Sequence, residues 1–127
     1  MIQGNVVGLQ AQIGVLFCLP DRSQILEIKC VVDTGFEGFL TLPPAAVAQL
    51  QLPYLINLNA NLADNSSVQT DVHLATILWN GVEKNVAVLA MGCRPLIGTA
   101  LLQNYHLGID FRDGGTVMID EMMIVGI

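Results

Sequence analysis

The stretch Val31-Val32-Asp33-Thr34-Gly35 places a carboxylate at the end of an apolar run, followed at once by a hydroxyl side chain and a glycine. If that run is a strand, its rigid backbone holds Asp33, and Gly35 allows another backbone or a substrate to approach closely. Asp, Thr and Gly are also common in ordinary turns that end strands. The tripeptide alone therefore leaves a catalytic aspartate and a simple turn both open.

The residues before Asp33 have the pattern of a half-buried strand. Apolar side chains alternate with charged ones over residues 24–33, which is the period-two spacing of a strand with one face on a core. The turn residues at 20–23 predict that 13–19 is its antiparallel neighbour. We expect Asp33 to follow directly after the second strand of this pair.

A second hairpin is predicted around Asn80-Gly81. These two residues separate the strand-like segments 72–79 and 82–90. A type I′ turn needs positive φ at both central positions, and Asn-Gly is the dipeptide that most readily supplies it. This is the strongest local structural signal in the chain.

Helical signals are confined to two short segments. Residues 44–50 begin with Pro44 at a first-turn position, and residues 99–105 begin with Thr99 as a candidate N-cap. Neither segment is long enough to organise the fold. The pattern therefore predicts an all-β domain with one or two short helices.

The length and charge of the chain bound its class. The 127 residues fit one domain, and we expect a single domain over 1–127. Hydrophobic residues make up 53% and charged residues 13%, against about 25% charged in ordinary domains. This composition predicts an apolar surface that meets a partner. Five Lys and Arg against eleven Asp and Glu exclude the basic footprint of a nucleic-acid binder.

Two long stretches carry no charged side chain, 1–20 and 38–63. Glycine, asparagine and glutamine interrupt the first, which also lacks a basic start, and prolines and asparagines interrupt the second. Neither matches a signal peptide or a membrane span. We therefore expect no membrane association and a cytoplasmic location.

The metal- and redox-active residue types form no recognisable site. Cys18, Cys30 and Cys93 match neither a zinc spacing nor a disulfide framework, and we interpret all three as small core residues. His73 and His106 have no second ligand at metal spacing. No metal and no cofactor are expected. Other acidic residues fall near predicted turns, where solvated carboxylates are usual, although Asp110 has Arg112 and Arg94 as possible ion-pair partners.

After the predicted Asn-Gly hairpin comes Leu96-Ile97-Gly98, followed by the short apolar helix. In order and spacing, Asp-Thr-Gly after an apolar strand, a hairpin, and two apolar residues with a glycine resemble the retropepsin-like aspartic proteases. The resemblance covers nearly the whole chain. The string 32–43 and the tail 107–111 are similar to the small bacterial and archaeal members rather than to the viral enzymes. The resemblance implies a closed β-barrel that forms one half of an acid protease.

The resemblance implies an aspartic endopeptidase that works as a homodimer on a peptide or protein. The chemistry needs two carboxylates, and the chain has one Asp-Thr-Gly. A two-fold axis would place Asp33 beside the partner's Asp33. Two carboxylates held at so short a distance from each other share one proton. The ionised one would act as general base on a water, and the protonated one would polarise the scissile carbonyl.

By the same resemblance, other residues support the catalytic loop or meet the substrate. The Thr34 hydroxyl would bond to backbone across the two-fold axis, and Gly35 belongs to the same loop. Leu96, Ile97 and Gly98 would pack behind it, where only a glycine leaves enough room. The terminal residues, including 122–127, would interleave with those of the second subunit in a shared sheet.

Residues 57–71 occupy the place of the flap that closes over substrate. Its predicted turn contains Asp64, Asn65 and Ser66. An extended peptide would add between this flap and the floor by strand pairing. The chain departs from the viral enzymes by carrying Phe36, which would narrow the cleft, together with Glu37 after the glycine, and by lacking glycines at the flap tip.

Two other interpretations remain open at this point. A protein of the same fold can lose cleavage and act as a dimeric peptide-binding or assembly module, because fold does not settle activity. An unrelated β-barrel would carry Asp-Thr-Gly as a turn. The elbow and phosphate-loop motifs of serine hydrolases and nucleotide enzymes are absent from the sequence.

Overall fold

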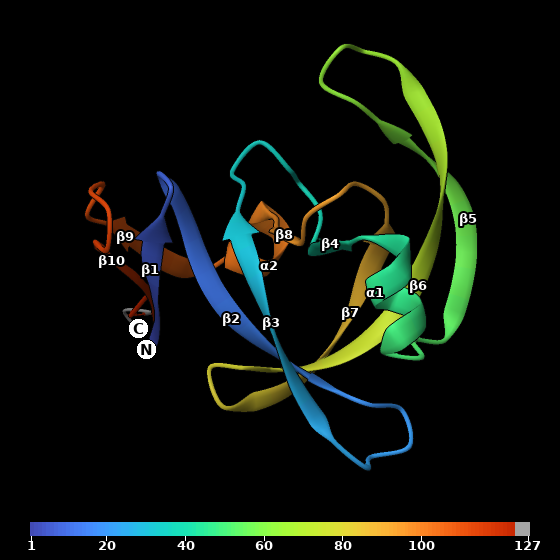
Figure 1. Cartoon of the computed structure of the whole chain (residues 1–127), viewed down its shortest axis with the longest axis horizontal. Helices are drawn as coiled ribbons and strands as arrows, with labels where there is room; N and C mark the ends of the chain where they lie inside the picture. The colour runs from blue at the N-terminus through green and yellow to red at the C-terminus, as the bar shows by residue number, and fades with distance from the viewer. Residues whose placement is uncertain (124–127) are drawn as a thin grey trace, which may run out of the picture.

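The structure is a computed structural model that describes residues 1–123. One continuous sheet of ten strands and two short helices make up this part of the chain (Figure 1). The strands are β1 (Ile2–Val7), β2 (Gln10–Cys18), β3 (Ile25–Val32), β4 (Leu40–Leu42), β5 (Tyr54–Asn61), β6 (Ser67–Trp79), β7 (Val82–Ala90), β8 (Leu96–Ile97), β9 (Tyr105–Ile109) and β10 (Thr116–Glu121). The helices are α1 (Pro44–Gln49) and α2 (Thr99–Leu102).

The sheet closes on itself to form a barrel. Its strand order is β5-β6-β7-β4-β8-β3-β2-β1-β10-β9, and β6 pairs in addition with β2, with Phe17 opposite Ile77. This extra pairing joins β6, β7, β4, β8, β3 and β2 into a closed barrel. The predicted all-β barrel with short helices is confirmed. At one end of the strand order β5 extends from the barrel, and at the other end β1, β10 and β9 do.

The predicted hairpins are present. Asn80 and Gly81 join β6 to β7 with φ angles of 52° and 79°, the positive values that a type I′ turn requires. The pair β2 and β3 runs antiparallel, with Ile13 opposite Cys30. The side of β3 that carries Cys30 packs on the core, as the alternation of its side chains predicts.

Apolar side chains fill the barrel and pack against β3 and β8. The largest fully buried ones include Ile13, Phe17, Leu40, Leu42, Ile77, Ile97 and Leu101. Each is worth about 1.5–3 kcal/mol of transfer free energy relative to an exposed side chain. Because Leu40 and Ile97 are part of this core, the strands on both sides of the Asp33 turn are fixed by packing.

The helices agree with the prediction at their starts, and one is shorter than predicted. Helix α1 has proline in its first turn. Helix α2 ends at Leu102, so the predicted helix over 99–105 was wrong beyond that residue. Asn104 adopts φ of 70°, which no helix residue can, and Tyr105 begins β9. Thr99 was wrongly predicted as the N-cap: Gly98 is the N-cap, Thr99 is the first helical residue, and no side chain caps the helix.

The prediction that all three cysteines lie in the core was wrong for Cys93. Cys18 and Cys30 are buried, and Cys93 is exposed. Cys93 stands in the loop between β7 and β8, where it follows Gly92 with φ of 81°. In a loop, no strand alternation indicates whether a side chain points inward or outward. The sequence therefore did not predict that Cys93 is exposed.

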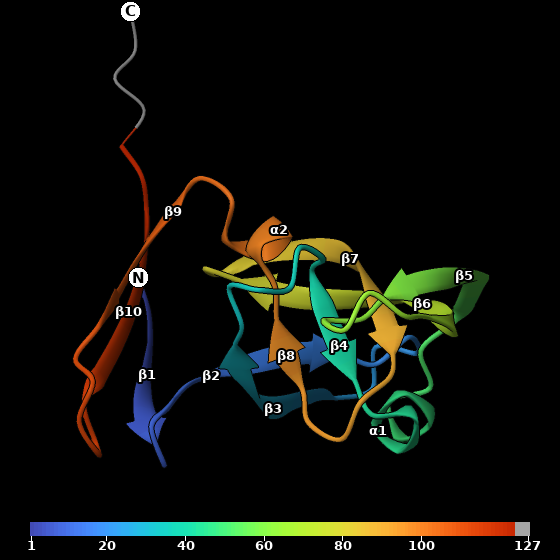
Figure 2. The same cartoon turned by 90° about the horizontal axis from the view of Figure 1, so that it is seen from above.

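The two ends of the described chain meet within one subunit. β1 pairs antiparallel with β10, with Ile2 opposite Ile119, and β10 pairs in turn with β9. Figure 2 shows these three strands to one side of the barrel. The described ends thus form a sheet within the subunit, while the last four of the residues 122–127 expected to interleave lie outside the described part. No helix within residues 1–123 is long and apolar enough to cross a membrane.

Candidate active site

The backbone of Asp33 is held by β8, a strand that lies beside it in the sheet but is distant in sequence. Asp33 comes directly after β3, which runs parallel to β8 with Val32 opposite Ile97. The Asp33 N–H donates a hydrogen bond of 2.9 Å to the Ile97 carbonyl, and the Val31 N–H donates one of 2.9 Å to the Pro95 carbonyl. The backbone of Asp33 is therefore held by the barrel itself.

The carboxylate of Asp33 is oriented by its own loop, residues 33–39. The Gly35 N–H donates to Asp33 Oδ1 over 2.9 Å, and the Phe36 N–H donates to the Asp33 carbonyl over 3.1 Å. The side chain is partly exposed, and none of the cations in the described residues forms a salt bridge with it. The carboxylate of Asp33 is therefore accessible from solvent.

Gly98 lies where no other residue fits. A Cβ at Gly98 would stand 2.5 Å from Cδ2 of Phe36 and would collide with the carbonyl oxygen of Gly38. The Gly98 N–H donates to the Phe39 carbonyl over 3.0 Å. The segment that follows β8 thus packs directly behind the Asp33 loop.

The Phe36 side chain packs between its own loop and the segment that follows β8. Its ring contacts the positions of Gly38 and Gly98, and it is absent from the residues that line the cavity beside Asp33. The Thr99 N–H and hydroxyl donate to the Phe36 carbonyl over 2.8 and 3.3 Å. The structure therefore gives Phe36 a supporting position, where the sequence suggested a residue that narrows the cleft.

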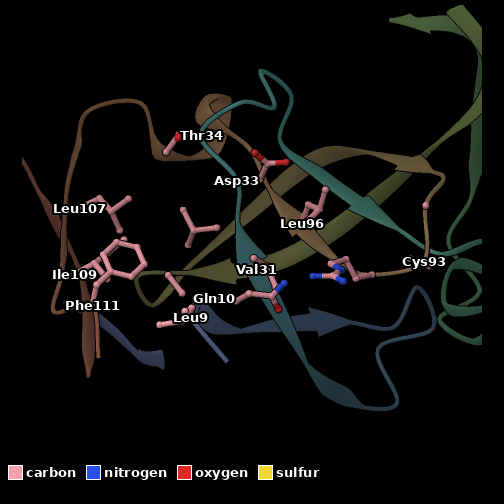
Figure 3. Close-up of a pocket in the computed structure, with 14 residues that line it drawn as sticks. Leu9, Gln10, Val31, Asp33, Thr34, Cys93, Leu96, Leu107, Ile109 and Phe111 are labelled. Atoms are coloured by element: carbon pink, nitrogen blue, oxygen red, sulfur yellow. The ribbon is translucent and has the colours of Figure 1, made fainter. Parts of the chain in front are cut away.

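A cavity of about 770 Å³ opens beside Asp33 and Thr34. Its walls are mostly apolar: Leu9, Ala11, Val31, Val32, Leu96, Leu107, Ile109 and Phe111. Figure 3 shows Leu107, Ile109 and Phe111 on one side and Leu96 and Cys93 on the other, with Asp33 above and between them. Of the supporting residues that the sequence predicted, Thr34 and Leu96 line the cavity, whereas Gly35, Ile97 and Gly98 do not.

Sequence reasoning did not find the β9 wall of this cavity. Leu9, Leu107, Ile109 and Phe111 come from the β1–β2 turn and from β9 with its following loop. Two of these four residues expose large apolar side chains: Leu9 is 72% exposed and Phe111 is 65% exposed. Exposure cannot be read from sequence without the fold.

The proposed flap residues form a structured hairpin tip away from the cavity. The Ser66 N–H and hydroxyl donate to Asp64 Oδ1 over 3.0 and 2.5 Å, and Asn65 has φ of 66°. These hydrogen bonds lower the pKa of Asp64 below its usual value. The β5–β6 hairpin projects from the same side of the barrel as the Asp33 loop (Figure 1), although none of the three residues lines the cavity.

The remaining polar candidates stand apart from Asp33. His73 lies edge-on to the Tyr54 ring at 5.7 Å, and His106 is exposed on β9. Asp110 forms no salt bridge with Arg112 or Arg94 in the described structure. Within residues 1–123, no group of three or more His, Cys, Asp or Glu side chains is arranged to hold a metal ion.

Comparison with known proteins gives relatives in structure only. No protein-family model matches the chain, and no curated protein matches it. Among solved structures, a retropepsin-like aspartic protease from Rickettsia conorii superposes with a TM-score of 0.55 at 14% identity, covering 93% of this chain and 92% of that one. The EIAV protease complexed with the inhibitor HBY-793 superposes with a TM-score of 0.50 at 17% identity, covering 76% and 89%.

Both matches span most of each chain, and their identities are too low to carry more than architecture. The closed barrel is thus a known architecture. The chain has the fold of the retropepsin-like aspartic proteases.

Proposed function

We propose that this protein is an aspartic endopeptidase that works as a homodimer, with Asp33 of each subunit as its catalytic carboxylate. The observation that carries the proposal is the setting of Asp33. In a retropepsin fold, the side chain is held by the Gly35 N–H, is free of any described cation, and opens onto an apolar cavity.

The chemistry follows from two carboxylates that share one proton. The ionised carboxylate removes a proton from a water held between the two, and the resulting hydroxide equivalent attacks the scissile carbonyl carbon. The protonated carboxylate donates its hydrogen bond to the carbonyl oxygen, which becomes a hydroxyl in the tetrahedral intermediate. Proton transfer to the amide nitrogen then breaks the C–N bond and leaves a carboxyl group and an amine.

One subunit cannot supply this pair, and its surface beside Asp33 favours a second copy. Leu9 and Phe111 expose large apolar side chains at the cavity wall. Contiguous apolar surface of this kind marks an interaction site in soluble proteins. A two-fold axis at this surface brings the two Asp33 side chains together from identical sequences.

Within residues 1–123, one edge of β9 is unpaired, and this edge gives the surface hydrogen-bonding capacity. The Asp110 N–H donates to the Thr116 carbonyl over 2.9 Å, so these two residues face each other in the β9–β10 ladder. Backbone groups alternate in direction along an antiparallel strand. The N–H and C=O groups of Tyr105, Leu107 and Ile109 therefore point away from β10, to the edge where the strand order ends.

Two copies of β9 can pair antiparallel about a two-fold axis with Leu107 opposite the partner's Leu107. Directly opposite side chains lie on the same face of a sheet, so both leucines face the cavity that contains Asp33. The axis through the centre of that ladder is perpendicular to the sheet, and Leu107 and Asp33 line the same cavity beside it. One symmetry operation then builds the shared sheet and the carboxylate pair.

The proposed substrate is an extended peptide held between the Asp33 loop and the β5–β6 hairpin. Strand pairing with backbone gives such a peptide its affinity, and side-chain pockets give it specificity. The hairpin projects on the same side as the loop, which suits a flap that closes over the substrate.

The test is cleavage of a mixed peptide library at pH 4–7 by the wild-type protein and by Asp33→Asn, with products identified by mass spectrometry. Sedimentation analysis first establishes that both proteins are folded dimers. We expect cleavage by the wild type and none by Asp33→Asn. A folded wild-type dimer that binds peptides without cleaving them would contradict the enzyme and leave a peptide-binding module.

A further inference from the structure

Arg94 brings the one positive charge to the walls of the described cavity. Of the residues that line it, only Asp33 and Arg94 are charged. The protein as a whole carries a net charge of -6 with five Lys and Arg. A cation beside the proposed catalytic carboxylate of an acidic protein is therefore a local exception to the charge of the molecule.

Three of the other four Lys and Arg side chains have a partner, and the fourth, Arg112, is exposed and does not line the cavity. Arg22 Nη1 lies 2.8 Å from Glu83, and Lys29 Nζ lies 3.1 Å from Glu27. Lys84 Nζ stands over the Phe39 ring at 5.9 Å. Arg94 is exposed and forms no salt bridge within residues 1–123. Its charge is available to a ligand in the cavity.

The loop that carries Arg94 is anchored at both ends. The Met91 N–H donates to the Leu42 carbonyl over 3.0 Å, and the Pro95 carbonyl accepts from the Val31 N–H over 2.9 Å. Gly92 makes the bend between them with φ of 81°. The backbone of Arg94 is therefore fixed relative to β3 and to Asp33.

The loop that carries Cys93 and Arg94 lies across the cavity from the proposed subunit contact. Figure 3 shows Cys93 across the cavity from Leu107 and Ile109 of β9. Arg94 precedes Ile97, the partner of the Asp33 N–H, by three residues (97 − 94 = 3). A chain spans at most about 3.6 Å per residue, so the Cα atoms of Arg94 and Ile97 are no more than about 11 Å apart. That distance corresponds to about three residues of an extended peptide.

We propose that Arg94 selects substrates with an acidic side chain within about three residues of the cleaved bond; this inference rests on the proposed function. A guanidinium binds a carboxylate through two parallel hydrogen bonds, which matches Glu or Asp and not their amides. Because a dimer carries one Arg94 on each side of the Asp33 pair, the preference extends to both sides of the scissile bond.

The size of the preference follows from exposed ion pairs. Such pairs contribute about 0.2–1 kcal/mol, so one Glu in place of Gln raises kcat/KM about 1.4- to fivefold. Salt reduces the ratio, because the Debye length falls from about 10 Å at 0.1 M to about 3 Å at 1 M. The ratio also falls as pH drops through about 4.3, where the substrate glutamate takes up a proton.

The experiment compares peptides that differ only by Glu or Gln at each position within three residues of a mapped cleavage site. The Glu/Gln ratio of kcat/KM is measured at pH 6 for the wild type, Arg94→Glu and Arg22→Glu. The control variant makes the same change of charge in the turn before β3, at the far end of that strand from Asp33. Asp33→Asn dimers provide a second readout, the affinity for the same peptides without turnover.

We expect the wild type and Arg22→Glu to prefer Glu at one or more positions and Arg94→Glu to reverse the preference to Gln. Equal ratios in the wild type and Arg94→Glu, in cleavage and in binding, overturn the inference. So does a dimer that dissociates on Arg94→Glu with its ratio unchanged, since Arg94 would then pair with a carboxylate of the partner subunit. If no peptide is cleaved but Asp33→Asn binds with the expected preference, the proposed enzyme fails and the role of Arg94 stands.

Discussion

Gly98 lies directly against the ring of Phe36, with a hypothetical Cβ at Gly98 only 2.5 Å from Phe36 Cδ2. The contact joins the end of β8 to the loop that carries Asp33, two parts of the chain that are far apart in sequence. The Gly38 carbonyl oxygen closes the remaining space around Gly98. The position of Asp33 therefore depends on a residue without a side chain.

Gly98→Ala should destabilise the protein. The added methyl group collides with the Gly38 backbone and with the Phe36 ring, and overpacking of this kind costs about 1–3 kcal/mol. The free energy of unfolding, measured by urea denaturation, checks it. Gly108→Ala is the control, because a Cβ there meets nothing within 4 Å. An equal loss in both variants would contradict the packing argument.

Leu107→Glu should convert the proposed dimer into a monomer and abolish cleavage. Its side chain faces the cavity, and the two-fold pairing of β9 would place two buried like charges side by side. Sedimentation equilibrium measures the mass. His106→Glu is the matched control on the same strand, with its exposed side chain on the opposite face. A dimeric Leu107→Glu variant would exclude the pairing of β9 with the partner's β9.

Thr34→Val should weaken the dimer while keeping the fold. Thr34 is exposed, and the proposed role of its hydroxyl is a hydrogen bond to backbone across the two-fold axis. Two such bonds per dimer, at about 0.5–1.5 kcal/mol each, give an increase in dimer Kd of about five- to 150-fold. Thr34→Ser keeps the hydroxyl and should bind like the wild type. Equal Kd values for Thr34→Val and the wild type would remove the hydroxyl from the interface.

Iodoacetamide should modify Cys93 and spare Cys30 in the native protein at pH 8. Burial raises the pKa of Cys30 to about 12, so this thiol is neutral and inaccessible, whereas Cys93 is exposed. Mass spectrometry of digested protein locates the label, and unfolded protein, labelled at all three cysteines, is the control. A bound peptide should slow the labelling of Cys93, which lines the cavity.

The turn at the tip of the β5–β6 hairpin should stay intact across pH 4–7. Hydrogen bonds from Ser66 lower the pKa of Asp64 below 3.8, so the folded state favours the ionised carboxylate. The contribution of the ionised Asp64 carboxylate to the stability of the turn is present above the pKa of the unfolded state. It is lost as pH falls through the lower pKa of the folded state. The Ser66 amide resonance, followed by NMR from pH 7 to 2, checks this order. In Ser66→Ala the Asp64 midpoint should move upward; an unchanged midpoint would show that Ser66 is not the cause.

Local sequence predicted those parts of the fold that local chemistry controls. Asn80-Gly81 has few alternatives to a tight hairpin, because both residues tolerate positive φ. Alternation along β3 reports its buried face, because successive side chains point to opposite sides of a strand. The packing of Gly98 behind the Asp33 loop was implied by the resemblance to the retropepsin-like aspartic proteases, and the structure brings the two together.

Contacts between distant segments could not be predicted in this way. Phe36 lies beneath the loop, Cys93 is exposed, and Leu107 joins Leu9 at one wall, because barrel closure brings their segments to these places. Sequence pattern gives the face of a strand but not which strand lies beside it, since that depends on the packing of the whole core. The residue types of the site can therefore be read from the sequence. The cavity, and the place of Arg94 in its wall, exist only once the sheet has closed.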